Sequence, residues 1–416
     1  MFEFGRDLRK LFAQARDSDD LSWLELISAD LVRVEARQQS IDAGRVSCAH
    51  PFEAYLRAGA LWREHTRRTG LGSSLERAHQ SAADAARAAG SDDQTARAAI
   101  EAAATGMLQF DLCGGARHLT RALGEIAALG ALRRAETTCA ATVVHARLRA
   151  REARLSGDPG DLLDAAALLD VALHGLTPDN SPIADDVRLD RAGLALEAGV
   201  ARRDARLLDQ AGRDLRSIVE GSTPEYRPLT RAKALTLCGA GMKALAELAG
   251  DAEAMQQGQA MFEAAADEFT PDHSPLDWVA IQIVRSDPAS SLSSLALAQA
   301  LSEGSGLILG ALARERRFAR EAALAEADGD RKTLSTLAAR LRGRLTDQSG
   351  HETPLDWAAD QIAMAHVHLA LGRLSGHQAT GIGMSLVEAA TTARELGAPA
   401  LAARAEALMD TRAARA

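Results

Sequence analysis

Aromatic residues and lysine are scarce in this chain of 416 residues, and each shortage restricts what the chain can be. Aromatic residues make up 3% of the sequence although hydrophobic residues make up 47%, so most apolar positions are alanine or leucine. Both residues favour helices strongly, and few runs of β-branched or aromatic residues are long enough for strands. Lysine occurs only at Lys10, Lys233, Lys243 and Lys332, and this bias toward arginine and alanine is typical of GC-rich bacterial genes.

Closely spaced cysteines and long apolar runs are also missing. The four cysteines have no short spacing, which excludes a zinc ribbon and a small disulfide framework; they are Cys48, Cys113, Cys139 and Cys238. Free thiols in helices are typical of a reducing compartment. The sequence contains no run of about 18 apolar residues and no signal-peptide core. We therefore expect a cytoplasmic protein without a membrane-spanning helix.

The sequence shows no basic stripe and no catalytic set. The formal charge of −9 comes from 48 basic and 57 acidic residues of interspersed sign, which argues against nucleic-acid binding. His366 and His368 are two residues apart, so they point about 200° from each other on a helix and cannot share a metal ion. The glycine-rich stretch 304–310 lacks the Lys-Ser or Lys-Thr of a phosphate loop. We expect a non-enzymatic protein with no cofactor and no metal.

One pattern, Pro-Leu-Asp-Trp-x-Ala-x-Gln, occurs twice, at residues 275–282 and 354–361. Proline suits the first position of a helix, where its missing N–H costs nothing, and aspartate suits the first turn. Ser274 and Thr353 stand where a helix N-cap is expected. The tryptophan and the glutamine are four residues apart and therefore lie on one face of the helix. The pattern predicts the start of a helical repeat with tryptophan as a packing residue.

Glycine and proline divide the rest of the chain into pairs of helical segments. Pro182, Pro228 and Pro275 open first helices and lie 46 and 47 residues apart, which indicates a repeat. The predicted pairs are 52–69 with 73–89, 92–110 with 116–129, 132–155 with 161–174, 183–198 with 204–220, 229–248 with 252–269, and 354–371 with 379–396. Further helical segments are predicted at 295–301, 307–327, 332–345 and 398–409.

These segments divide the chain into four parts. Residues 1–50 hold an amphipathic helix and a long capping helix, and residues 51–283 hold the first helical repeats. Residues 284–306 are predicted to be an irregular insertion or hinge, because a polar break interrupts the helical pattern soon after the first copy of the repeated motif. Residues 307–416 hold the C-terminal repeats and a capping helix.

The N-terminal part has two amphipathic stretches. Residues 1–14 combine apolar and basic side chains and are expected to cap the end of the array, or to make weak contact with an anionic membrane surface. Residues 21–43 are predicted to form one long helix. Its apolar seam follows spacings of three and four and consists of Leu24, Ile27, Leu31, Val34, Gln38 and Ile41. This seam is expected to pack against the chain itself, with homodimerisation as the alternative.

The second copy of the repeated pattern extends further than the first. Trp357, Ala358, Gln361, Leu371 and Gly372 stand where bacterial tetratricopeptide-type repeats carry the same residues, and the chain therefore resembles that family. Its repeat spacing of roughly 40 to 50 residues is longer than the ~34 residues typical of the family. The resemblance implies an all-α fold, an α-α superhelix of antiparallel helix pairs, with a protein or peptide bound along the inner wall that the first helices form.

The candidate binding residues are polar positions on the predicted first helices. They are Arg63, Arg67, Arg188, Arg191, Arg231 and His366, with Arg68 and Lys233 beside them. The leading hypothesis is an adaptor or scaffold that holds a protein or peptide in its groove. The alternative is a regulator that senses a ligand or peptide and changes the curvature of the array. Some relatives hold a C-terminal carboxylate with a Lys and Asn clamp, which is not expected here because the one asparagine, Asn180, is predicted in a loop.

Overall fold

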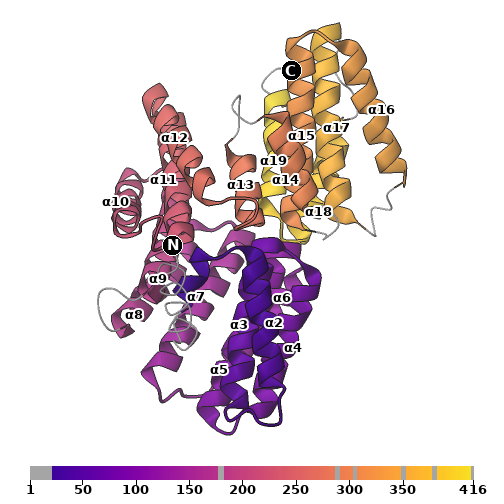
Figure 1. The fold of residues 1–416 in the computed structure, drawn as a ribbon. Coiled ribbons are helices and arrows are strands. Elements are labelled where there is room, and N and C mark those ends of the chain that lie inside the picture. The colour runs from indigo at the N-terminus through magenta and orange to yellow at the C-terminus, as the bar shows by residue number, and fades with distance from the viewer. Residues whose placement is uncertain are drawn as a thin grey trace, which may run out of the picture.

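The structure is a computed structural model, and it describes residues 21–176, 182–285, 291–302, 307–347, 353–376 and 382–413. The predicted amphipathic stretch 1–14 lies outside these residues. Within the described ranges the chain forms one 3-10 helix, eighteen α-helices and no strand (Figure 1). The 3-10 helix is η1 (Ser22–Leu26), and the α-helices are α2 (Ala29–Ala43), α3 (Pro51–Thr69), α4 (Gly72–Ala88), α5 (Asp92–Cys113), α6 (Ala116–Ala127), α7 (Ala135–Ser156), α8 (Pro159–Gly175), α9 (Pro182–Arg202), α10 (Ala205–Gly221), α11 (Pro228–Ala249), α12 (Ala252–Glu268), α13 (Pro275–Val284), α14 (Leu292–Ser302), α15 (Ile308–Ala327), α16 (Arg331–Asp347), α17 (Pro354–Ser375), α18 (Ile382–Glu395) and α19 (Pro399–Ala413).

Consecutive helices pack side by side as antiparallel pairs, and the first helices of successive pairs also touch one another. These second contacts join α3, α5, α7, α9 and α11 into one inner row, and they join α15 to α17 in the C-terminal part. The expected all-α superhelical array of helix pairs is therefore confirmed. Every pair predicted between residues 52 and 269 is present, with helix ends that differ from the prediction by a few residues.

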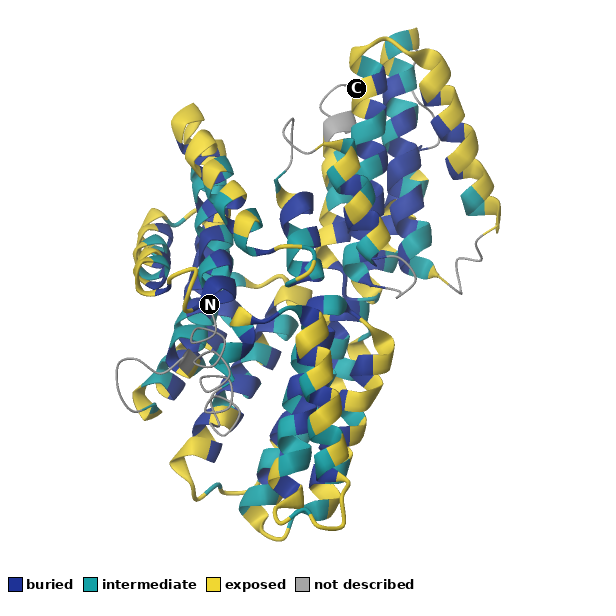
Figure 2. Cartoon of the chain, in the orientation of Figure 1, coloured by how far each residue is buried: buried dark blue, intermediate teal, exposed yellow. Residues whose placement is uncertain are grey.

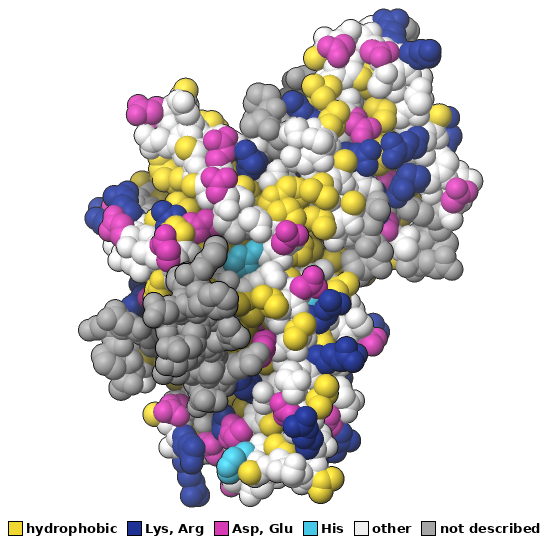
Figure 3. Space-filling view, viewed as in Figure 1, with side chains coloured by type: hydrophobic (Ala, Val, Ile, Leu, Met, Phe, Trp, Pro, Cys, Tyr) yellow, Lys and Arg dark blue, Asp and Glu magenta, His cyan; other side chains and the backbone are white. Residues whose placement is uncertain are grey.

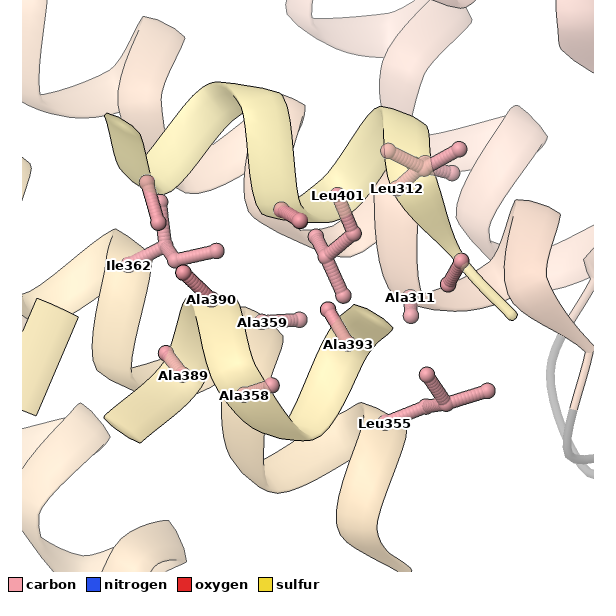
Figure 4. Close-up of a cluster of buried hydrophobic side chains, with 14 of the residues drawn as sticks. Ala311, Leu312, Leu355, Ala358, Ala359, Ile362, Ala389, Ala390, Ala393 and Leu401 are labelled. Atoms are coloured by element: carbon pink, nitrogen blue, oxygen red, sulfur yellow. The ribbon is translucent and has the colours of Figure 1, made fainter. Parts of the chain in front are cut away.

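Alanine and leucine build the core, as the composition predicts. The helices bury one side and expose the opposite side, as Figure 2 shows. In the C-terminal part, Ala358, Ala359, Ala389 and Ala390 are almost completely buried in one cluster with Leu401 of α19 (Figure 4). Small side chains let neighbouring helices approach closely, so the leucines of one helix fit between the residues of the next.

The predicted continuous helix at 21–43 is wrong. The chain forms η1, becomes extended at Ile27, and starts α2 only at Ala29. The reason is the guanidinium of Arg68, which donates hydrogen bonds of 2.8 Å to the carbonyl oxygens of Leu24 and Ile27. A continuous helix would use the same two carbonyls for N–H groups four residues later. The buried arginine therefore ends the helix at this point.

The apolar seam of this region divides at the same break. Leu24 and Ile27 are buried in a cluster with residues of α2, α3 and α4. Leu31, Val34 and Ile41 of α2 are 52%, 56% and 48% exposed. Packing against the chain itself is thus confirmed for the first part of the seam. Homodimerisation through the exposed part stays a prediction.

The predicted irregular insertion at 284–306 contains an ordered helix. Leu292–Ser302 forms α14, which packs against α13 and α15 and completely buries Leu295 and Ala298. The helical periodicity predicted at 295–301 is thus present as a helix, because two apolar side chains three positions apart give α14 a buried face. The role of the whole segment as a hinge stays a prediction. The polar break that motivated the prediction lies partly outside the described residues.

The repeated pattern starts two helices as predicted, but its caps differ. A proline opens both α13 and α17, and Trp278 and Trp357 are half-buried against the hydrophobic core. The expected side-chain caps do not form, since neither N-cap side chain of these two helices accepts a bond from a helix N–H. Ser274 donates its hydroxyl to the Asp277 carboxylate instead.

The array curves so far that its first and last parts meet (Figure 1). Arg67 of α3 lies 2.7 Å from Asp277 of α13, which is 210 residues away in sequence. At a second point, the N–H of Gly115 donates to the carbonyl of Leu396 at 2.9 Å. Gly114 permits this approach, because a Cβ there would stand 1.8 Å from the Leu396 oxygen. The chain is therefore closed on itself, and α7 to α12 connect the two parts that meet.

Replacement of Gly239 by alanine should destabilise the packing of α11 on α12. A Cβ at this position would meet the Gly258 carbonyl oxygen at 2.9 Å and the Phe262 ring at 3.0 Å, so the helices must move apart. We expect the free energy of unfolding, measured by urea titration, to fall by about 1–3 kcal/mol.

Gly124→Ala in α6 is the control for this substitution. A Cβ at Gly124 meets no atom within 4 Å. Alanine in a helix interior should stabilise the protein there by about 0.5–1 kcal/mol. Equal effects of the two substitutions would contradict the close packing described for α11 and α12.

Candidate functional site

An apolar groove of about 780 Å³ runs along the inner row of helices, between α7, α9, α11 and α13. Residues three and four apart share one face of a helix, so each helix contributes a short row to the floor. The floor residues are Leu189, Gly193, Leu196 and Val200 of α9, Leu237, Ala240 and Ala244 of α11, and Phe269, Ala280 and Ile281. Glycine and alanine at the centres of these rows keep the groove open.

Three charged side chains at the edge of the groove, Arg154, Asp190 and Glu197, are held in ion pairs. Arg154 lies 2.9 Å from Glu197, and Asp190 lies 2.5 Å from Arg147. Ion pairs along the edge leave the floor itself apolar. Such a site favours an apolar occupant whose polar groups reach the edge.

One end of the groove meets a group of charges that we call the closure cluster, formed by Glu64, Arg67, Arg68 and Asp277. Arg68 is completely buried and lies 2.6 Å from Glu64. Glu64 also pairs with Arg67 at 2.8 Å, and Arg67 pairs with Asp277 at 2.7 Å. Since Arg68 also holds two carbonyls next to η1, the closure cluster connects η1, α3 and α13.

The closure cluster keeps its carboxyl groups ionised at neutral pH. Burial alone raises the pKa of Glu64, but Arg67 and Arg68 outweigh burial and hold that pKa well below its usual range. For Asp277, burial is outweighed by Arg67 and Lys233, so the pKa is lowered as well. Both carboxylates therefore stabilise the closed array as long as they remain charged.

A second group of charges ties η1 to the middle helices. Arg227 is 1% exposed and donates to Glu25 of η1 and to Asp186 of α9, at 2.8 Å each. The Glu25 carboxylate also accepts the N–H of Thr230 at 2.8 Å, near the start of α11. Lys233 lies one turn further along α11, where it lines both the groove and a polar cavity of about 210 Å³.

The structure brings some of the predicted binding residues together. Arg63 and Arg67 line the polar cavity with Lys233. Arg63 is paired with Glu101 at 2.8 Å, and Arg67 belongs to the closure cluster. Arg68, which the sequence places beside them, has no exposed surface. These arginines hold parts of the array together at one end of the groove.

Arg188 and Arg191 lie in a different cleft, of about 370 Å³, between α8, α9 and α10. Arg191 is 2.5 Å from Asp170 of α8 and 2.8 Å from Asp214 of α10. It therefore joins the second helices of two successive pairs, on the side of α9 away from the groove floor.

Arg231 and His366 line neither the polar cavity near Arg67 nor the cleft that holds Arg191. Arg231 pairs with Glu268 of α12 at 3.0 Å. His366 of α17 lies 3.1 Å from Glu315 of α15, in the C-terminal part. The six predicted residues thus occupy four different neighbourhoods.

The groove floor was missed because the sequence-based selection considered polar positions. Leu196, Leu237 and Ala240 look like core positions of any helix pair when only the sequence is known. The small residue Gly193 in the middle of a first helix is the one signal that could have pointed to an open face.

The described ranges contain no group of three or more His, Cys, Asp or Glu side chains arranged to hold a metal ion. Among the helices in those ranges, none is both long enough and apolar enough to cross a membrane. Figure 3 shows basic and acidic side chains interspersed over one face, with hydrophobic side chains gathered near its centre.

No family model matches this chain, and no curated protein matches it. Among solved structures, it is similar to a chain described as a "Circular tandem repeat protein with novel repeat topology and enhanced subunit contact surfaces". The identity is 16% over 94% of this chain and 97% of that chain, with a TM-score of 0.22. A TM-score this low supports no argument about fold or function, so the helical repeat architecture rests on the chain's own helices and their contacts.

Replacement of Asp277 by asparagine should destabilise the protein in a pH-dependent manner. At pH 7 the substitution removes a charged partner of Arg67, and the free energy of unfolding should fall by about 1–3 kcal/mol. Because the pKa of Asp277 is lowered in the folded protein, the unfolded chain takes up this proton first as the pH falls below about 4. The stabilisation is therefore present above that pH and is lost below it.

Urea titrations of both proteins between about pH 3 and pH 7 check this expectation. The difference in stability should shrink as the pH falls. Asp30→Asn is the matched control, because Asp30 is 82% exposed in its pair with Arg33 and should contribute less than about 1 kcal/mol. A difference for Asp277→Asn that stays constant over the whole range would contradict the proposed charge state.

Proposed function

We propose that this chain is a non-enzymatic adaptor or scaffold that holds an apolar peptide segment of another protein in the groove between α7, α9, α11 and α13. The observation that carries the proposal is the groove itself, with its apolar floor on the inner row of helices and its ion-paired edge. Repeat arrays of helix pairs commonly bind partners along this concave wall.

The dimensions of the groove suit such a segment. Along α11 the groove extends from Lys233 to Ala244, which at about 1.5 Å per residue is a length of about 16 Å. Roughly five residues of extended peptide, or three turns of an amphipathic helix, cover that length. The leucines and alanines of the floor would contact apolar side chains at alternate or helical spacing.

A second candidate function is a regulator that senses a small apolar ligand or a peptide. The volume of about 780 Å³ lies within the range of roughly 300–1,000 Å³ that is typical of small-molecule sites. Asp277 of α13 belongs both to the groove and to the closure cluster. An occupant that displaced α13 would thereby change how the array closes.

We assign the array to the tetratricopeptide type on the strength of its repeated sequence pattern, and we expect a bacterial protein of the cytoplasm that does not bind nucleic acid. The half-buried Trp278 and Trp357 support this type, because they occupy equivalent places in two repeats. The helix pairs here are longer than those typical of the family, so the assignment concerns the packing scheme.

A peptide-display experiment tests the proposed function. A random library of peptides of about 12 residues is selected on the immobilised full chain, and we expect enriched sequences rich in apolar residues. Ala240→Trp places an indole on the exposed part of the groove floor. It should weaken the selected peptides at least tenfold, which corresponds to about 1.4 kcal/mol.

Ala260→Trp is the matched control, because Ala260 is an exposed alanine on α12 that does not line the groove. Its peptide affinity should equal that of the unmodified chain. Equal binding by the Ala240→Trp variant would place the peptide elsewhere. Failure to select any peptide, together with ligand binding seen by native mass spectrometry, would favour the sensing function.

A further inference from the structure

A second apolar cavity, partly open to solvent, lies beside the groove and is lined by residues of α9, α10, α11 and α12. Its volume is about 120 Å³. Six of its thirteen lining residues are leucines, and two of them, Leu196 and Leu237, also line the groove. These two side chains are therefore the partition between the two spaces. Movement of one leucine would connect the cavity to the groove.

Glycine creates this cavity. Gly212 of α10 lines it, and a Cβ at that position would meet no atom within 4 Å. Gly241 of α11 lines it as well, and there a Cβ would come within 2.9 Å of Leu196. Leu196 thus leans over a position without a side chain, while the space in front of Gly212 remains empty. Met242 and Met261 complete the wall with flexible side chains that adapt to an occupant.

The interior of the cavity offers little to a polar molecule. The thiol of Cys238 is half-buried in its wall, and burial raises the pKa of this thiol, so it is neutral at physiological pH. Arg216 also lines the cavity, but its side chain belongs to an exposed residue of α10. A cavity of ~150 Å³ lined by leucine-like side chains is known to stay dry and to bind benzene or xenon.

We propose that this cavity is a binding site for one small, uncharged, apolar group of about the size of a benzene ring. The group can be a free molecule or an apolar side chain of the peptide in the groove. The second source rests on the proposed function, because the side chain would enter past Leu196 and Leu237. The site itself does not depend on that function, since it is built by residues of four helices.

Benzene binding to the full chain tests the site directly. Benzene should raise the melting temperature of the unmodified protein by about 1–3 °C. Gly212→Leu fills the cavity from a position with free space and should abolish this rise. Gly343→Leu is the matched control, because Gly343 is a helical glycine of α16 whose Cβ would also meet nothing within 4 Å. If Gly212→Leu does not fold, Gly212→Ala should give a reduced rise.

Alkylation of Cys238 by N-ethylmaleimide gives a second, local readout. Benzene should slow this reaction at least threefold, as measured by peptide mass spectrometry. Cys113 is the internal control, because it is also half-buried with a pKa raised by burial but does not line the cavity. No thermal effect of benzene and no protection of Cys238 would overturn the proposal.

The selected peptides separate the two sources of the apolar group. Protection of Cys238 by peptide as well as by benzene would identify a peptide side chain as the natural occupant. Protection by benzene alone would identify a free apolar molecule. Benzene binding without any selected peptide would leave this site in place and remove only the proposed function.

Discussion

The guanidinium of Arg68 is the group on which the arrangement of the array depends. A completely buried cation costs several kcal/mol of lost hydration unless every donor is paired. Its partners are the carbonyls of Leu24 and Ile27 and the carboxylate of Glu64, so it fixes η1 against α3. Glu64 orients Arg67, and Arg67 reaches α13. One buried charge therefore determines where three distant segments lie.

The groove takes its shape from the same contacts. Its walls on α7, α9 and α11 come from ordinary packing between successive first helices, whereas α13 is held from the other side by α3. Arg227 adds a link from η1 to α9 and α11. The groove is thus preorganised by polar contacts that lie at its end and outside its floor, and a preorganised site loses less conformational freedom when it binds.

Local sequence signals predicted the helices, and long-range contacts caused the errors. Alanine and leucine periodicity, with glycine and proline between segments, located the helix pairs because these signals act within one turn. The helix break at Ile27 depends on Arg68, which lies 41 residues later, and the residues near Ile27 contain no signal that predicts the break. The arginines were selected as binding candidates because they are polar residues on first helices. The acidic partner that holds Arg67 inside the fold lies 210 residues away in the sequence, so the sequence alone did not show that this arginine is already paired. The glycines that open the second cavity, such as Gly212, look like any helical glycine.

Closure also fixes the number of repeats. In an open array, a duplicated or deleted helix pair adds or removes one step of the spiral and leaves every other neighbour in place. Here such a change between α3 and α13 would move Asp277 away from Arg67, which would then keep Glu64 of its own helix as its acidic partner and lose its contact with α13. A change of one repeat between these helices would therefore break the contact that closes the array, whereas in an open array it would leave the remaining contacts intact.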